Sequence, residues 1–298
     1  MKKDIYQEVT NSIIEALEKI SLKDYQAPFA RLTEQQLPIN PMTENKYHGI
    51  NTLLLWLEQQ EHSYSSNEWG TFKQWKDKGA HVKKGEKSTL IIFFKQVEKK
   101  DRAEQSDEAE FYNMLQYYWV FNADQIEGYE PVTGLEQGNF GTVETIKNIE
   151  RFIEATGAVV EPDQNRACYS PLLDKIQMPK KELFFDNGQS ATENYYAVLL
   201  HELTHWTGSE DRLNRAKHVS SKENYAFEEL IAELGSAFLC AQFGIKQHGR
   251  NDHALYLKSW LQALKNDKKY IFKASSQAQK AVDYLIRHGD IKQKFMVA

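Results

Sequence analysis

The sequence predicts an α+β fold in two domains. Its first half contains two runs dominated by β-branched and aromatic residues, 88–97 and 115–121, which indicate strands. Its second half is dominated by runs with apolar residues at helical spacing. Between the halves, residues 128–141 contain four glycines and one proline and follow neither periodicity. We therefore place a first domain at residues 1–135 and a second at residues 142–298.

The first domain is expected to mix helices and strands. Residues 4–20 and 52–60 have apolar side chains at helical spacing, and a loop with three prolines, 21–49, separates them. Residues 68–78 predict a short helix or turn rich in aromatic side chains. Residues 98–110 are almost purely polar and charged, which is typical of a loop between two strands of a hairpin.

The second domain is expected to be mainly helical. It opens with a helix at 143–156, which Gly157 ends, and short strands are expected within 167–185. Two helices that carry the candidate site follow. Residues 254–266 and 275–287 then predict the last two helices.

Composition limits the class of protein. The chain has 298 residues, of which 41% are hydrophobic and 27% charged, which is ordinary for a globular protein. The net charge of −5 means that any nucleic-acid site depends on local charge. Two distant cysteines, Cys168 and Cys240, fit a reducing compartment. Acidic residues interrupt 1–20, so it is no signal peptide, and no run is long enough to span a membrane. We therefore expect a cytoplasmic protein without membrane contact.

A candidate metal site lies in the run Y-Y-A-V-L-L-H-E-L-T-H-W-T-G, residues 195–208. His201 and His205 are four residues apart, so a helix places both imidazoles on one face, where they can bind one metal ion. Glu202 lies beside them, where it can act as a general base toward water. The residues before His201 are apolar, and burying such polar groups there is costly unless they have a function.

The third metal ligand has more than one candidate. Asp211 completes the spacing H-E-x-x-H-x-x-G-x-x-D. Glu229 and Glu233 lie one turn apart on a second helical run, 225–239, where the neighbouring side chains on the same face are small and uncharged. We favour Glu229, and Asp211 and Glu233 remain alternatives. Glu228 lies at the edge of the apolar stripe and is expected to be solvated.

This arrangement resembles the gluzincin metallopeptidases, in which the first carboxylate binds zinc and an acid one turn later orients a histidine. The resemblance implies that Glu229 binds the metal and that Glu233 orients a ligand imidazole. The predicted cofactor is one divalent metal ion, with Zn²⁺ favoured, although two histidines and a glutamate also suit Mn²⁺. The donor that would stabilise an oxyanion stays open among His218, Tyr225, His248 and His253.

The first domain contains a local excess of positive charge. Residues 71–100 contain nine lysines and three acids, and aromatic residues are interleaved with them. Lysines that neutralise phosphates and rings that stack on bases are typical of sites for single-stranded nucleic acid. The alternative is that the rings are core residues and the lysines a solvated face. The candidate contact residues are Trp69, Phe72, Lys73, Trp75, Lys76, Lys83, Lys84 and Lys87.

Several ordered motifs along the chain resemble the ArdC antirestriction proteins, whose first domain is related to the TraC-type primases. The motifs are N-P-M-T (40–43), Y-H-G-I-N (47–51), W-G-T-F-K-Q (69–74), V-K-K-G-E-K (82–87), V-F-N-A-D-Q-I (120–126), H-E-L-T-H-W-T-G (201–208) and R-L-N-R (212–215). The chain departs from the family at Gly70, where a larger apolar residue is expected.

The resemblance implies an N-terminal domain that binds single-stranded DNA and a C-terminal zincin-like metallopeptidase domain. It also implies a plasmid protein that shields incoming DNA from host restriction during conjugation. Two rival hypotheses are retained. In one, the chain is an intracellular metallopeptidase whose first domain recognises a host protein substrate. In the other, it is a DNA-binding protein whose zincin half is only structural.

Overall fold

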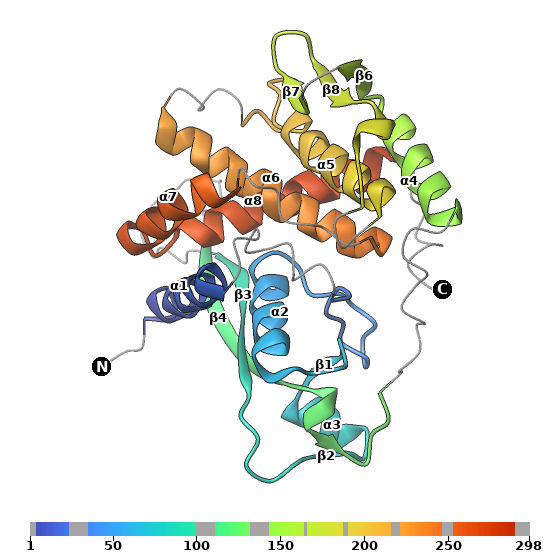
Figure 1. Cartoon of the computed structure of the whole chain (residues 1–298). Coiled ribbons are helices and arrows are strands. Elements are labelled where there is room, and N and C mark those ends of the chain that lie inside the picture. Colours follow the sequence, from blue (N-terminus) through green and yellow to red (C-terminus); the bar gives the residue numbers. More distant parts are fainter. Residues whose placement is uncertain are drawn as a thin grey trace. The chain divides into compact units, whose positions relative to one another are not determined.

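The computed structural model describes residues 4–23, 35–98, 111–131, 143–163, 166–186, 190–215, 221–245 and 253–289 (Figure 1). It confirms the predicted α+β class. The chain divides into two compact units. Unit 1 combines Met1–Leu37 with Val132–Ala298, and unit 2 is Pro38–Pro131. The predicted boundary after residue 135 thus lies close to the end of unit 2, but residues 1–37 belong with the second half of the chain.

The first helix, α1 (Ile5–Lys23), explains this difference in the division of the chain. Its apolar stripe, which includes Val9, Ile13 and Leu17, is buried. The Thr10 hydroxyl donates a hydrogen bond of 2.8 Å to the carbonyl of Lys268, which lies just before α8 (Tyr270–His288). An amphipathic helix must bury its stripe against another element, and spacing within the helix does not indicate which element that is.

Unit 2 is built on a three-stranded antiparallel sheet in the order β1-β4-β3. A second, two-stranded sheet pairs β2 with β5. The elements of the unit are α2 (Ile50–His62), β1 (Trp69–Thr71), α3 (Phe72–Asp77), β2 (His81–Val82), β3 (Thr89–Glu98), β4 (Phe111–Asn122), the 3₁₀ turn η2 (Ala123–Gln125) and β5 (Ile126–Glu127). Both predicted long strands are confirmed, and the loop expected between them lies mostly outside the described residues.

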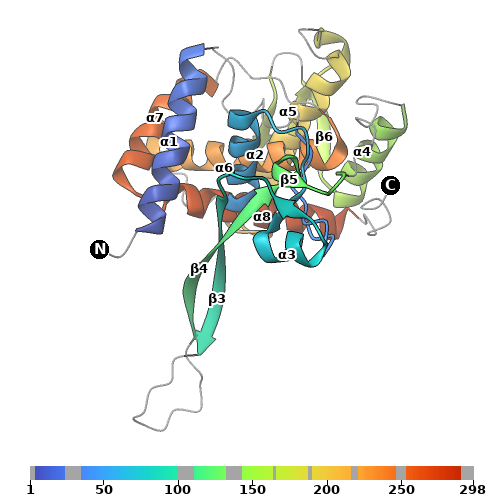
Figure 2. The ribbon, with the colours of Figure 1, turned by 90° about the horizontal axis from the view of Figure 1, so that it is seen from below.

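Strands β3 and β4 form a long two-stranded ribbon, which Figure 2 shows extending away from α2 and α3. The ribbon is attached to α2 through the buried side chain of Asn51. Its amide nitrogen donates to the carbonyl of Ile92 at 2.7 Å, and the N–H of Ile92 donates to its amide oxygen at 2.9 Å. One side chain therefore satisfies both backbone groups of an edge-strand residue.

Two of the predicted nucleic-acid contacts are core residues instead. Trp69 packs with Leu55 and Val120, and Trp75 packs with Ala80 and other residues; both indole rings are fully buried. A base cannot stack on a ring that has no exposed face, so these two assignments are wrong. Alternation of aromatic and basic residues does not tell which rings face inward.

Burial of Trp75 also accounts for Gly70. A Cβ atom at this position would lie 3.1 Å from the Trp75 indole and 3.2 Å from the end of Met42. Contacts of this length are tighter than ordinary packing, so a larger residue requires these side chains to move. The glycine is thus an adaptation to the size of its neighbours.

In unit 1, helix α5 packs on a small sheet in the order β6-β8-β7, in which β6 is parallel and β7 antiparallel to β8 (Figure 1). Helices α5 and α6 pack on each other, and α6 and α5 both contact α8. The elements are α4 (Val143–Thr156), β6 (Val159–Asp163), β7 (Cys168–Ser170), β8 (Lys175–Pro179), the 3₁₀ turn η3 (Lys181–Leu183), α5 (Ala191–Trp206), α6 (Lys222–Phe243), α7 (His253–Asn266) and α8 (Tyr270–His288). No helix within the described residues is long and apolar enough to cross a membrane.

We expect Asn51→Ala to lower the free energy of unfolding by about 2–3 kcal/mol, because it leaves two buried backbone groups without their partner. Denaturant unfolding of the full chain measures this. The matched control is Asn45→Ala, which removes the same side chain from an exposed position in the same unit. Equal stability of the two variants would show that the ribbon does not depend on this contact.

Candidate metal centre

Helix α5 begins at Ala191, four residues before the apolar run that indicated it. The Ser190 hydroxyl accepts a hydrogen bond from the N–H of Glu193, and the Glu193 carboxylate accepts one from the N–H of Ser190, which together form a capping box. The helix then carries His201 and Glu202, which are buried, and the partly buried His205.

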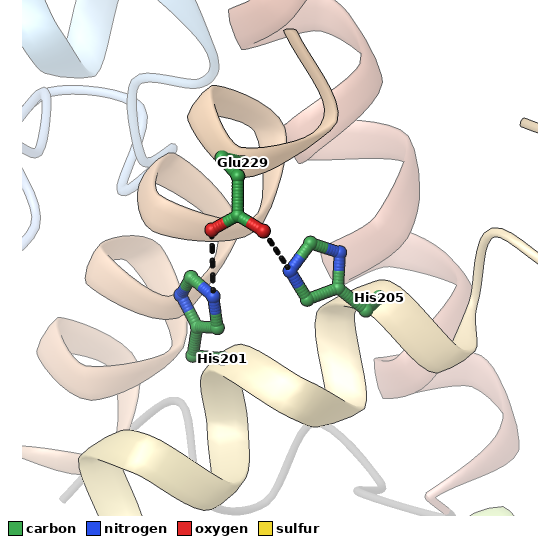
Figure 3. A group of neighbouring side chains, drawn as sticks. All are labelled: His201, His205 and Glu229. Atoms are coloured by element: carbon green, nitrogen blue, oxygen red, sulfur yellow. Dashed lines mark ion pairs between the residues drawn. The ribbon is translucent and has the colours of Figure 1, made fainter. Parts of the chain in front are cut away.

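Glu229 of α6 lies opposite the two histidines (Figure 3). Its Oε2 is 3.6 Å from Nε2 of His201, and its Oε1 is 3.5 Å from Nε2 of His205. The ligand atoms of these three residues all lie within 4.8 Å of one another. Two imidazole nitrogens and a carboxylate oxygen this close together can bind one divalent ion.

The other candidates for the third ligand occupy different places. Asp211 is exposed in the turn after α5 and is outside the three-residue group. Glu233 is fully buried on the other side of His201, with Oε2 3.6 Å from Nδ1. The geometry therefore favours Glu229 as ligand and Glu233 as the acid that orients His201.

The expectation that Glu228 is solvated is wrong. Only 12% of its side chain is exposed, and its Oε1 lies 3.4 Å from Nδ1 of His205. Arg215 holds the carboxylate through two hydrogen bonds. The apolar stripe of α6 is wide enough to bury a residue at its edge once a cation is available to pair with it.

Strong electrostatic coupling links the three proposed ligands. Burial alone lowers the pKa of His205, but the carboxylates of Glu228 and Glu229 outweigh it and raise this pKa to about 10. Burial alone raises the pKa of Glu229, but hydrogen bonds and charge from His201 and His205 hold it far below its ordinary value. In the metal-free protein the positive charge of protonated His205 thus compensates the negative charge of the buried Glu229 carboxylate.

The carboxylate of Glu202 is held by the small sheet. The backbone N–H of Tyr169, in β7, donates to Oε2 of Glu202 at 2.8 Å. Arg212 secures this part of the sheet, because it donates to the Tyr169 hydroxyl at 3.1 Å and forms an ion pair with Asp174. Its guanidinium also stacks on the Trp206 ring, 3.9 Å from the centroid. Tyr169 and Arg212 were not predicted as part of the site, although Arg212 belongs to the R-L-N-R motif that follows the metal helix.

Tyr225 is the oxyanion candidate that the structure describes near the site. It lies one turn before Glu229 on α6, and its side chain is about half exposed. Burial and the negative charge of Glu229 raise the pKa of its hydroxyl, which therefore stays a proton donor. His218 and His248 lie outside the described residues, and the His253 side chain is also outside them.

The remaining predicted nucleic-acid contacts are exposed. Phe72 is 58% exposed, and the five lysines are at the surface, although Lys83 also donates to the carbonyl of Asp124. The larger group of exposed rings lies on the β3–β4 ribbon, outside the predicted set. A ribbon exposed on both faces leaves consecutive aromatic residues at the surface. The exposed ribbon rings are Phe93, Phe94, Tyr117, Tyr118 and Trp119.

Comparison with known families agrees with the two halves of the chain. Residues 147–277 match the family described as zincin-like metallopeptidase. Residues 3–121 match the N-terminal domain of anti-restriction factor ArdC. The fold and the metal centre thus define a protein with a zincin-like metallopeptidase domain.

Two relatives, one of them in two crystal structures, extend the comparison to nearly the whole chain. The crystal structure of antirestriction protein ArdC from plasmid R388, without metal, is 37% identical, covers 96% of this chain and 98% of its own, and gives a TM-score of 0.77. Its Mn(II)-bound structure, aligned at 35% identity over 98% of this chain and 100% of its own, gives 0.70. Protein y4eC of Sinorhizobium fredii is 35% identical over 95% of this chain and 91% of its own. The chain belongs to the ArdC antirestriction family.

DNA primase TraC of Escherichia coli is 33% identical over 96% of this chain, which spans 27% of the primase. The resemblance to both ArdC and the TraC-type primases is therefore confirmed. The zincin-like domain and the Mn(II)-bound relative indicate a divalent metal.

We expect metal binding to release protons. The folded pKa of His205 lies above the ordinary 6.5, so its protonated form stabilises the metal-free protein below about pH 6.5, and this stabilisation is lost as the pH rises through about 10. A metal ion must displace that proton, so its apparent affinity should rise by up to about tenfold per pH unit for each proton released.

Calorimetric titration with Zn²⁺ at about pH 6, 7 and 8, in buffers of different ionisation enthalpy, counts the released protons. All three pH values lie below the raised pKa of His205. His288→Asn, at an exposed position at the end of α8, is the control and should leave the pH dependence unchanged. An affinity that does not change with pH would contradict the coupling.

Proposed function

We propose that this chain is an antirestriction protein that binds single-stranded DNA without sequence preference and carries a zinc-dependent peptidase site. The family and the name of the relative ArdC support the antirestriction role. The name of TraC, a DNA primase, supports contact with DNA. We further predict that the protein acts in the cytoplasm, in plasmid conjugation, and that its substrate is a host protein.

The observation that carries the DNA-binding part is the row of rings on the β3–β4 ribbon. Five aromatic side chains there expose between 42% and 51% of their surface, which is unusual for large apolar groups unless they contact a partner. Tyr117 and Trp119 lie on one face with their centroids 6.4 Å apart, and Phe93 and Tyr118 lie on the other, 5.4 Å apart. Flat rings with a free face can stack on bases of any sequence.

Exposed positive charge in the same unit favours a nucleic acid over an uncharged partner. Phe72 and the exposed lysines Lys73, Lys76, Lys83, Lys84 and Lys87 remain proposed contacts. Each lysine that pairs with a phosphate releases a counterion, which favours binding at low salt. Because the chain as a whole has a net charge of −5, this effect must arise locally.

In the proposed peptidase site, His201, His205 and Glu229 would hold the ion. When bound, a divalent ion lowers the pKa of water and polarises a substrate carbonyl. The Glu202 carboxylate, held through Oε2 by the N–H of Tyr169, would accept the proton of the attacking water and deliver it to the leaving amine. Tyr225, with a hydroxyl that keeps its proton, would donate to the developing oxyanion.

We expect the full-length chain to bind a fluorescent poly-dT oligonucleotide and to lose at least about tenfold in affinity between about 50 and about 200 mM salt. Tyr117→Ala and Trp119→Ala should each weaken binding by about 1–3 kcal/mol, because each removes a stacking platform. Fluorescence anisotropy measures both effects.

Phe185→Ala provides a matched control, since it removes another exposed aromatic ring, in unit 1. It should bind the oligonucleotide like the original chain. An affinity for the oligonucleotide that does not change with salt, or that is unchanged in both ribbon variants, would favour the rival hypothesis that this surface recognises a host protein.

We expect Glu202→Gln to retain the metal and to lose about 10²- to 10⁴-fold in peptide cleavage, because the amide cannot accept the proton. New peptide termini in a denatured host-protein mixture, detected by mass spectrometry, measure cleavage. Glu223→Gln, an exposed acid in the first turn of α6, is the control. Cleavage by Glu202→Gln at the original rate would exclude Glu202 as the base, and absence of cleavage in every variant would favour a structural role for the zincin half.

A further inference from the structure

Arg215 is buried next to Glu228, and the proposed peptidase chemistry gives it no role. Only 7% of the residue is exposed. Its Nε and Nη2 donate to the two carboxylate oxygens of Glu228 at 3.1 and 2.9 Å. Nη1 donates to the Thr207 hydroxyl at 2.9 Å, and Nη2 also donates to the carbonyl of Thr204 at 2.8 Å. The guanidinium is thus fixed both to Glu228 on α6 and to the end of α5.

Glu228 connects this arginine to a proposed ligand. Its Oε1 lies 3.4 Å from Nδ1 of His205, while the other ring nitrogen, Nε2, faces Glu229 and the metal position. A histidine binds a metal through one nitrogen, and the hydrogen bond made by the other nitrogen sets the orientation of the ring. Glu228 therefore takes for His205 the place that Glu233 takes for His201.

Gly208, the glycine of the 201–208 motif, makes room for this ion pair. A Cβ atom at this position would lie 3.1 Å from Nη2 of Arg215 and 3.3 Å from Oε1 of Glu228. The N–H of Arg215 also donates to the carbonyl of Gly208 at 2.8 Å, which closes the loop after α5. The absence of a side chain at Gly208 therefore leaves space for the Arg215–Glu228 ion pair, and its carbonyl also accepts the hydrogen bond that closes the loop.

Stability alone gives little reason for such a pair. Removing two charges from water costs about as much free energy as their attraction returns, and apolar residues of similar volume often serve as well. Contact with the ring of a ligand gives the pair a function beyond packing. We propose that Arg215 and Glu228 are positioning residues that hold His205 in the orientation that binds the metal. This inference rests on the proposed metal site and adds the residues that support its second histidine.

The test measures the dissociation constant for Zn²⁺ by competition with a fluorescent chelator, on the full-length chain. Glu228→Gln should weaken Zn²⁺ binding by about 10- to 100-fold, the usual effect of losing such a partner. Glu228→Asp keeps the charge beside Arg215 but shortens the side chain, so it should fold like the original and still bind Zn²⁺ more weakly. Circular dichroism of the metal-free proteins establishes that they are folded.

A double-mutant comparison tests the role of the arginine. Because Arg215 acts through Glu228, Arg215→Gln should weaken Zn²⁺ binding, and Arg215→Gln with Glu228→Gln should bind no more weakly than Glu228→Gln alone. Glu223→Gln, which removes an exposed acid from the first turn of the same helix, controls for effects on α6 and should bind like the original chain.

The outcomes separate this inference from the proposed function. If the original chain binds no Zn²⁺, the proposed metal site itself is excluded. If the original chain binds Zn²⁺ and the folded Glu228→Asp and Glu228→Gln variants bind it equally well, the pair is only structural and the inference is overturned. Losses that add in the double variant would likewise overturn the claim that Arg215 acts through Glu228.

Discussion

The organisation of unit 1 depends on the burial of acidic side chains between α5 and α6. Glu202, Glu229 and Glu233 are almost fully inaccessible, and Glu228 is nearly so. Uncompensated carboxylates cost several kcal/mol each in such surroundings. Two imidazoles, one guanidinium, a backbone N–H and a divalent ion can compensate them. The positions of the two helices, the turn after α5 and the edge strand β7 follow from the need to bring these groups together.

Helices α5 and α6 can approach each other closely because one of the residues at their contact, Gly235, has no side chain. At Gly235 of α6, an added Cβ atom would come within 2.6 Å of the Thr204 side chain on α5. Two helices can approach this closely only where one of them lacks a side chain. Small residues on the acidic face of α6 therefore serve to bring the carboxylates within reach of the histidines.

Much of the metal centre was predictable from the sequence, because its spacing is local. His201, Glu202 and His205 share one helix, and Glu229 was indicated by the small residues around it. The partners of Glu228 and Glu202 were not predictable, since Arg215 and Tyr169 reach them through the fold. In unit 2 the long strands were predicted. The inward direction of Trp69 depends on the pairing of β1 with β4, and that of Trp75 on the face by which α3 packs; residue types alone reveal neither.

Unit 1 is discontinuous in sequence, because Pro38–Pro131 is inserted between α1 and the rest of it. The hydrogen bond from Thr10 to Lys268 joins positions 258 residues apart. A chain made on the ribosome from its N-terminus can complete unit 2 early, whereas α1 must wait until the last helices have emerged. During that interval the apolar stripe of α1 has no partner from its own unit. The order of synthesis thus favours maturation of unit 2 before unit 1, and leaves the last packing step of unit 1 to the end of translation.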